Sequence, residues 1–138
     1  MGMIHVMIVD DDADDTDFLK AAFAKRLDNI RFTECQTGQL AVNCLKGLFA
    51  NPLDIPDIIF LDLHMPGMPG LQALREIKAQ PAFAHIPVMI ISTSSLKAEK
   101  DQTLAAGGTR FYIKPASLDA YDMIVEDSLR YLSQKHMA

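Results

Sequence analysis

Five polar side chains suited to phosphoryl chemistry each end or directly follow a short apolar run of the sequence: Asp10, Asp11, Asp62, Ser92 and Lys114. The carboxyl ends of parallel strands meet at one edge of a sheet, where ligands bind, so we expect these side chains to gather there. A single acid could simply end a strand. Three acids, a hydroxyl and a lysine at successive strand ends form a much rarer set, and this joint pattern predicts a functional site.

The three carboxylates would repel one another, because two charges about 5 Å apart cost on the order of 3 kcal/mol at an effective dielectric of about 20. We therefore expect a cation among them. An all-oxygen ligand set suits Mg²⁺ or Mn²⁺, and Mg²⁺ prefers one or two carboxylates together with waters and a phosphate. Lys114 could bind one phosphoryl oxygen and the Ser92 hydroxyl could donate to another. The set predicts phosphoryl transfer by positioning and charge neutralisation, without a general base.

The apolar runs before these residues predict the strands that position them. The run from Ile58 to Leu61 is unbroken, as in a strand buried on both faces of a parallel sheet. Two prolines and two glycines follow Asp62 before the next helix, so the loop is stiff and holds Asp62 at the end of the strand. The run from Ile30 to Cys35 alternates apolar and polar residues, which indicates an edge strand.

Helical periodicity after each run predicts five helices. We interpret Asp14, Asp15 and Asp17 as residues of the first helical turn whose charge complements the helix dipole. Asp10 and Asp11 precede that helix, at the tip of the strand. The fourth helix, over 96–106, has few apolar residues, so we expect it to be loosely held.

Five alternations of strand and helix, joined by right-handed crossovers, predict an α/β fold: a five-stranded doubly wound parallel sheet of the flavodoxin-like type. With the alternating second strand at an edge, the strand order is 2-1-3-4-5. The topological switch point then lies between the first and third strands, which places Asp10 and Asp11 beside Asp62.

Composition limits the classes of function. The 138 residues are 49% hydrophobic and 22% charged, as expected for one soluble domain. The net charge of -5 and the lack of a basic stripe argue against direct binding to nucleic acid or an anionic membrane. With no signal peptide and no apolar run of membrane-spanning length, we expect a cytoplasmic protein. Cys35 and Cys44 lack a metal-binding spacing, and we interpret both as ordinary thiols.

Over nearly its whole length the chain resembles the receiver domain of two-component response regulators, including the single-domain regulators of the chemotaxis type. Four blocks carry the resemblance: Ile8-Val9-Asp10-Asp11, Leu61 to Pro66 with Gly70, Pro87 to Ser92, and Ile113-Lys114-Pro115. It implies a single receiver domain over 1–138 with no output domain. Such a domain is a phosphorylation-dependent signalling module that takes part in its own phosphorylation and dephosphorylation, and is no enzyme toward other substrates.

The resemblance also implies roles for individual residues. Asp62 would accept a phosphoryl group from a histidine kinase or a phosphotransfer protein. The ligands of Mg²⁺ would be three carboxylates and one backbone carbonyl, from Asp10, Asp11, Asp62 and His64. Ser92 would be the switch hydroxyl and Phe111 the switch aromatic, with Lys114 binding the phosphoryl group. A cis peptide bond would join Lys114 to Pro115.

The chain departs from the family pattern at three places. Where the family often has threonine and then alanine, this chain has Ser92-Thr93, so Thr93 is an alternative switch hydroxyl; we favour Ser92, five residues after Pro87. The frequent Asp-Gly before the third helix is Pro69-Gly70 here, and Asn51 to Pro56 lengthens the approach to the third strand. We expect the signal to reach a downstream protein through the fourth helix, fifth strand and last helix.

Two other functions fit parts of the pattern. An aspartate-nucleophile phosphatase of the haloacid dehalogenase type would use Asp10-x-Asp12 with Ser92 and Lys114, but it gives Asp62 no role and needs a longer chain for its cap. A flavodoxin-like nucleotide binder would need a Gly/Ser/Thr phosphate loop after the first strand, where the run of aspartates would instead repel phosphate. The position of a phosphoryl label discriminates among these functions.

Overall fold

The computed structural model describes residues 3–48 and 51–137. Strands and helices alternate along the chain as the sequence predicts, with one extra 3₁₀ turn. The elements are β1 (Ile4–Val9), α1 (Ala13–Ala24), β2 (Ile30–Cys35), α2 (Gly38–Lys46), η1 (Pro52–Asp54), β3 (Ile58–Asp62), α3 (Gly70–Ala79), β4 (Val88–Ser92), α4 (Lys97–Ala105), β5 (Arg110–Ile113) and α5 (Leu118–Met137).

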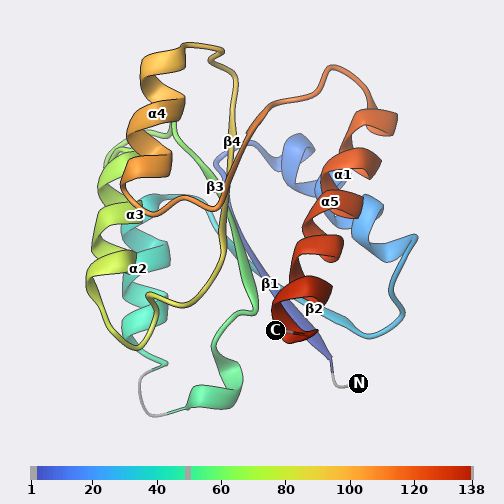
Figure 1. Cartoon of the computed structure of the whole chain (residues 1–138), viewed down its shortest axis with the longest axis horizontal. Helices are drawn as coiled ribbons and strands as arrows, with labels where there is room; N and C mark the ends of the chain where they lie inside the picture. The colour runs from blue at the N-terminus through green and yellow to red at the C-terminus, as the bar shows by residue number, and fades with distance from the viewer. Residues whose placement is uncertain (1–2, 49–50, 138) are drawn as a thin grey trace.

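The five strands form one parallel sheet in the order β2-β1-β3-β4-β5, which confirms the predicted topology. In Figure 1, α2, α3 and α4 cover one face of the sheet, and α1 and α5 cover the other. Each residue of β3 is buried, as expected for a central strand between two layers of helices. β2 is partly exposed, as expected at an edge.

Alternate residues of the strands enter two separate cores. Val9 and Leu61 pack with α2 and α3, whereas Ile8 and Phe60 pack with α1 and α5. Because side chains of a strand point alternately to the two faces, an unbroken apolar run fills both cores at once. The two cores fix the ends of β1 and β3 relative to each other, which is the relation that the site requires.

Backbone packing holds the loop after β3 close to the strand. A Cβ atom at Gly70, the first residue of α3, would lie 2.5 Å from the carbonyl oxygen of Asp62, so only glycine fits there. The Gly70 amide also donates to the Leu63 carbonyl across 3.1 Å. Gly67 has a φ of 82°, in the left-handed region that glycine favours. The glycines therefore permit the tight turn, and the prolines limit its motion.

The peptide bond before Pro115 differs from the expectation based on the sequence. The Lys114–Pro115 bond is trans, since the described residues contain no cis peptide bond. The prediction of a cis bond is therefore wrong, and the chain keeps the isomer that an X–Pro bond favours by about 0.5–1 kcal/mol.

The lengthened segment Asn51 to Pro56 contains η1, where Asp54 forms an ion pair with Arg31 at 3.3 Å. Within the described ranges, no helix has the length and apolar character needed to span a membrane.

Candidate functional site

The acidic cluster lies where β1 and β3 end side by side. Asp62 is the last residue of β3 and is 4% exposed, and Asp10 follows β1 directly. One carboxylate oxygen from each of Asp10, Asp11 and Asp62 lies within 4.8 Å of the others. The structure therefore brings together the three acids singled out from the sequence. Asp11 is exposed, so the cluster is open to solvent on that side.

Lys114, which follows β5, lies among these acids. Its Nζ atom is 3.1 Å from Asp10 Oδ2, 3.2 Å from Asp62 Oδ2 and 2.8 Å from Asp15 Oδ2. The Lys114 backbone amide donates to the Ser92 carbonyl across 2.7 Å, which fixes the start of its side chain beside β4. The repulsion expected among the carboxylates is therefore offset in part by an ammonium group of the chain itself.

Asp15 belongs to this site, although its interpretation as a plain helix-start residue gave it no such role. It does lie in the first turn of α1, whose N-cap is Asp12. Its Oδ1 accepts a hydrogen bond from the buried Tyr121 hydroxyl across 3.2 Å, while Oδ2 binds Lys114. A signal was present in the sequence: Asp15 stands four residues before the buried Leu19 and therefore shares the inner face of the helix.

The surroundings shift the pKa of several groups in the cluster. Burial raises the pKa of Asp10 to about 6, although the Asp12 amide and the Lys114 charge act in the opposite direction. Burial alone would lower the pKa of Lys114, but the hydrogen bond to Asp15 and the charges of Asp10 and Asp62 outweigh it and raise that pKa. Lys114 therefore keeps its positive charge over the whole physiological pH range.

Ser92 and His64 approach the cluster from the side of α4. Ser92 is fully buried at the end of β4, whereas Thr93 is exposed. The His64 amide donates to Asp62 Oδ1 across 3.1 Å. Glu99, which the sequence did not single out, binds both residues: its Oε1 accepts from Ser92 Oγ at 3.2 Å and lies 2.7 Å from His64 Nε2.

The two aromatic residues of β5 point to opposite faces of the sheet. Phe111 is half-buried and packs against the core beneath α2 and α3. Tyr112 packs against the other core, and its hydroxyl donates to Asp127. Burial and this hydrogen bond raise the pKa of Tyr112 to about 12. Phe111 is thus on the same side of the sheet as α4.

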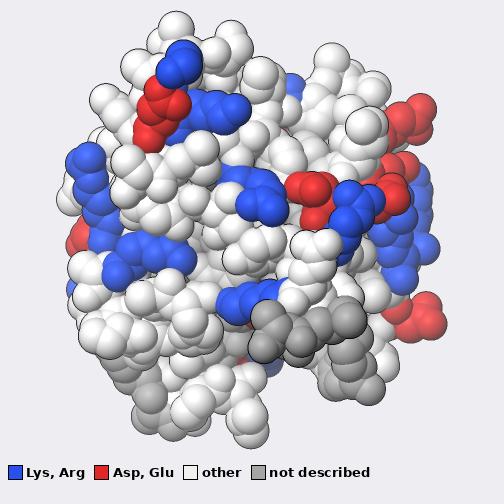
Figure 2. Space-filling model, viewed as in Figure 1, with Lys and Arg blue, Asp and Glu red and all other residues white. Residues whose placement is uncertain are grey.

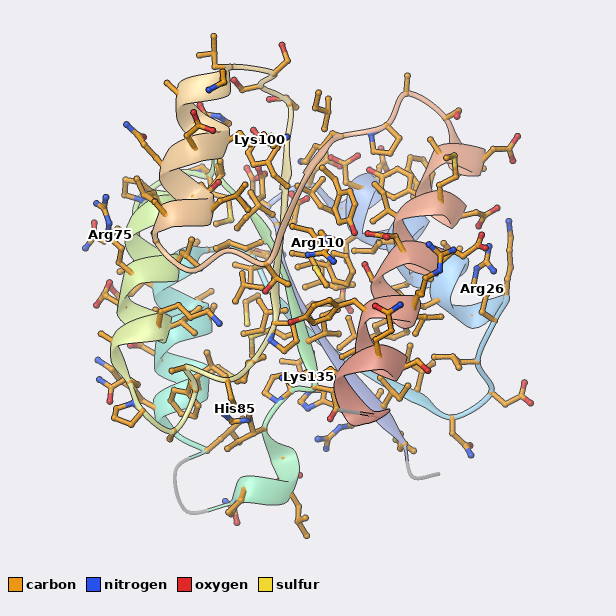
Figure 3. All side chains as sticks on the ribbon, viewed as in Figure 1. Arg26, Arg75, His85, Lys100, Arg110 and Lys135 are labelled. Carbon is orange, nitrogen blue, oxygen red and sulfur yellow. The ribbon has the colours of Figure 1, made fainter. Side chains whose placement is uncertain are left out.

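The surface beside β5 carries both charged and apolar groups. Arg110 points toward α5 in Figure 3, and its guanidinium carbon lies 5.1 Å from the ring centroid of Tyr131. Acidic and basic side chains lie next to one another over α5 (Figure 2), among them the ion pairs of Arg130 with Glu126 and Asp127. Ile113 and Met123 are 54% and 72% exposed on the same side.

The donor set fits a hard divalent cation. All three acids of the cluster offer carboxylate oxygens, and neither a thiol nor an imidazole is among them. Asp62 combines burial, a backbone amide at one oxygen and the Lys114 ammonium at the other. Such surroundings can position a carboxylate for attack on phosphorus and neutralise charge that develops on phosphoryl oxygens.

Comparisons with known proteins agree with this geometry. The family model described as "Response regulator receiver domain" matches residues 6–126. Among relatives, the two-component response regulator ARR5 of Arabidopsis thaliana is 30% identical over 120 residues, which cover 84% of this chain and 65% of ARR5. Response regulator PleD of Caulobacter vibrioides is 42% identical over 62 residues, covering 45% of this chain and 14% of PleD. The chain thus spans less than two thirds of either relative.

Solved structures share the fold. The phosphorylated cyanobacterial phytochrome response regulator RcpA superposes with a TM-score of 0.86 at 26% identity, covering 97% of this chain and 96% of RcpA. The Mn²⁺-bound form of response regulator Rcp1 superposes with a TM-score of 0.78 at 21% identity, covering 90% of each chain. At that lower identity the second likeness concerns the fold alone.

Proposed function

Because the chain belongs to the family of response regulator receiver domains, the phosphoryl-accepting modules of two-component systems, we propose that Asp62 accepts a phosphoryl group from a histidine kinase or a phosphotransfer protein. The position of Asp62 carries the proposal. It is a buried carboxylate at the switch point of the sheet, at the end of β3, and the close approach of Gly70 holds the loop that follows it. Asp10 and Asp11 lie beside it, and Lys114 donates to it.

The proposed chemistry requires no general base. A carboxylate oxygen of Asp62 attacks phosphorus, the bond from phosphorus to the donor's imidazole nitrogen breaks, and an acyl phosphate forms. Lys114 already contacts Asp62 and needs little movement to bind a phosphoryl oxygen on it. Ser92, one strand away on the same edge, donates to another phosphoryl oxygen. The chain thus acts on itself rather than on a separate substrate.

Asp10, Asp11, Asp62 and the backbone carbonyl of His64 would hold Mg²⁺, or Mn²⁺ in its place. The bound ion supplies charge neutralisation for the phosphoryl oxygens. Lys114 binds Asp10 and Asp62 from one side, which leaves the exposed Asp11 as the acid nearest to solvent. The response regulator Rcp1, which shares this fold, is known in a Mn²⁺-bound form, and in this chain the three carboxylates within 4.8 Å of one another support a divalent cation.

We place the output surface on α4, β5 and α5. Ile113, Met123 and Leu96 expose apolar side chains there. Lys100 and Arg110 lie between α4 and α5 in Figure 3 and add positive charge. A hollow of about 750 Å³ lies between β5 and α5 and is lined in part by Ile113 and Met123. A downstream protein with apolar and acidic groups would fit this surface.

Labelling with a small phosphodonor tests the proposal. Acetyl phosphate with Mg²⁺ should add one acid-stable, base-labile phosphoryl group, and mass spectrometry of peptides should place it on Asp62. Asp62→Asn should abolish labelling while the circular dichroism spectrum stays unchanged. Single-site labelling that persists in this variant contradicts the proposal. A label on Asp10 instead would favour the haloacid dehalogenase type of phosphatase. The match of residues 6–126 to the response regulator receiver domain does not support that type.

A further inference from the structure

Glu99 of α4 has no part in the chemistry proposed above, yet it binds two residues of the acceptor site. Its Oε1 accepts a hydrogen bond from Ser92 Oγ across 3.2 Å and lies 2.7 Å from His64 Nε2. The Glu99 side chain is 21% exposed and Ser92 is fully buried. One carboxylate oxygen therefore ties the end of β4 and the loop after β3 to the first turn of α4.

The Ser92 hydroxyl has a single proton to donate. In this structure that proton goes to Glu99, while the hydroxyl oxygen accepts a hydrogen bond from the Ser94 amide across 3.1 Å. A phosphoryl group on Asp62 has acceptor oxygens only, so Ser92 must donate to bind it. The bond from Ser92 to Glu99 and a bond from Ser92 to a phosphoryl oxygen therefore exclude each other.

Helix α4 is only weakly buried, so the loss of the bond from Ser92 to Glu99 would affect how it is held. Of the nine residues of α4, all of them described, only Thr103 is buried. The residue at its N-cap, Leu96, has a side chain that cannot accept a hydrogen bond from the first helical amides. With so little apolar burial, polar bonds of the first turn matter more for holding α4 against the sheet than they would in a well-buried helix.

We propose that Glu99 is a positioning residue that holds the Ser92 hydroxyl in the unphosphorylated protein and competes with the phosphoryl group for it. When Ser92 donates to the phosphoryl group instead, Glu99 loses one of its two partners and the first turn of α4 is released. This inference rests on the proposed function of Asp62. It adds Glu99 as a competing acceptor within the chain. Part of the free energy of binding the phosphoryl group is then used to break the bond from Ser92 to Glu99 and so to release α4.

Beryllofluoride, a phosphoryl analogue formed from Be²⁺ and fluoride, tests the competition at equilibrium. With Mg²⁺ present and binding measured by calorimetry, Glu99→Ala should tighten beryllofluoride binding about three- to tenfold, the range expected for loss of one competing hydrogen bond. Glu99→Gln keeps an acceptor without the charge and should fall between wild type and Glu99→Ala. The matched control is Asp101→Asn, since Asp101 is exposed on the same helix and pairs with Lys97; it should bind like wild type.

A double variant separates competition from other effects of Glu99. In the Ser92→Ala background the hydroxyl is gone, so adding Glu99→Ala should leave beryllofluoride affinity unchanged. If Glu99→Ala tightens binding equally in both backgrounds, the effect comes from charge or helix packing and the inference is overturned. It is also overturned if Glu99→Ala alone binds no more tightly than wild type. A wild type that fails to bind beryllofluoride with Mg²⁺ rejects the proposed function itself, and the inference falls with it.

Discussion

The Lys114 ammonium lies 2.8 Å from Asp15, nearer than its 3.2 Å distance to Asp62, the proposed phosphoryl acceptor. This contact joins the end of β5 to the first turn of α1. Tyr121 extends it to α5, because the Tyr121 hydroxyl donates to the other oxygen of Asp15. Asp15 therefore makes the shortest of the three ion pairs that hold Lys114 before any phosphoryl group arrives.

Asp15→Asn should lower the free energy of unfolding by about 0.5 to 1.5 kcal/mol, the net value of one hydrogen-bonded contact. The loss stays small because Lys114 keeps Asp10 and Asp62, and the asparagine carbonyl can still accept from Tyr121. Urea unfolding with EDTA measures it. Asp17→Asn, at an exposed position of the same helix, is the control and should unfold like wild type. Equal stability of Asp15→Asn and Asp17→Asn would mean that the Lys114–Asp15 contact adds nothing to the fold.

The raised pKa of Asp10, about 6, predicts how stability depends on pH when no metal is present. Between the unfolded pKa of about 3.9 and the folded value, the native state holds more protons than the unfolded chain. The contribution of Asp10 to the free energy of unfolding should therefore fall as pH rises through this window, by on the order of 3 kcal/mol, and level off above it. Asp10→Asn should lack this fall. Urea unfolding of both proteins from pH 4 to 7 in EDTA measures the difference, and parallel curves would contradict it.

Metal binding should stabilise the fold. A cation that binds only the native state adds about 2.7 kcal/mol at a hundred times its Kd, which corresponds to a rise of several degrees in Tm. Asp11→Asn is the most informative variant, because Asp11 is exposed and the described ion pairs of Lys114 are with Asp10, Asp15 and Asp62. We expect it to melt no lower than wild type in EDTA and to gain less from Mg²⁺. A wild-type Tm unaffected by millimolar Mg²⁺ would count against a metal site.

Much of this architecture could be predicted from the sequence because it depends on local patterns. Apolar runs predicted β1, β3 and β4, with His5 the one polar residue in the first of them, and the order of the strands followed from the alternation with helices. Topology alone then placed Asp10 near Asp62. Asp15 and Glu99 could not be assigned in this way, because the reach of a side chain across two elements depends on tertiary packing. Each belongs to a helix whose first turn commonly contains acids, so residue type alone carried no distinct signal, although the spacing of Asp15 from Leu19 places it on the inner face of α1.

The strength of the repulsion among the acids could not be predicted from the sequence either. The sequence places Lys114 at the correct edge, but the three distances from its ammonium group to Asp10, Asp15 and Asp62 depend on how β5 and α1 pack. The three carboxylates alone would therefore leave more negative charge for a metal to neutralise than remains once Lys114 lies among them. The distances show that Lys114 already neutralises part of this charge at Asp10 and Asp62, which is why Asp11 rather than Asp62 gives the cleaner metal test.

Gly70 provides a test of how backbone packing positions Asp62. In Gly70→Ala the new Cβ would lie 2.5 Å from the Asp62 carbonyl oxygen and 2.6 Å from Leu63 Cα, so the strand end and the helix start must move apart. We expect a loss of about 1 to 3 kcal/mol in the free energy of unfolding, typical of overpacking. Because the acceptor loop moves with the strand end, labelling by acetyl phosphate should also slow.

Gly47→Ala is the matched control. Gly47 has a φ of -68°, and a Cβ there would lie 3.4 Å from the Cys44 carbonyl oxygen, an ordinary contact. This variant should be as stable as wild type or slightly more so, since alanine restricts the unfolded chain. Urea unfolding and the rate of labelling, measured on both variants, separate a general effect of removing glycine from a local effect at Asp62. If Gly70→Ala unfolds and labels like Gly47→Ala, the close approach of α3 does not position the acceptor.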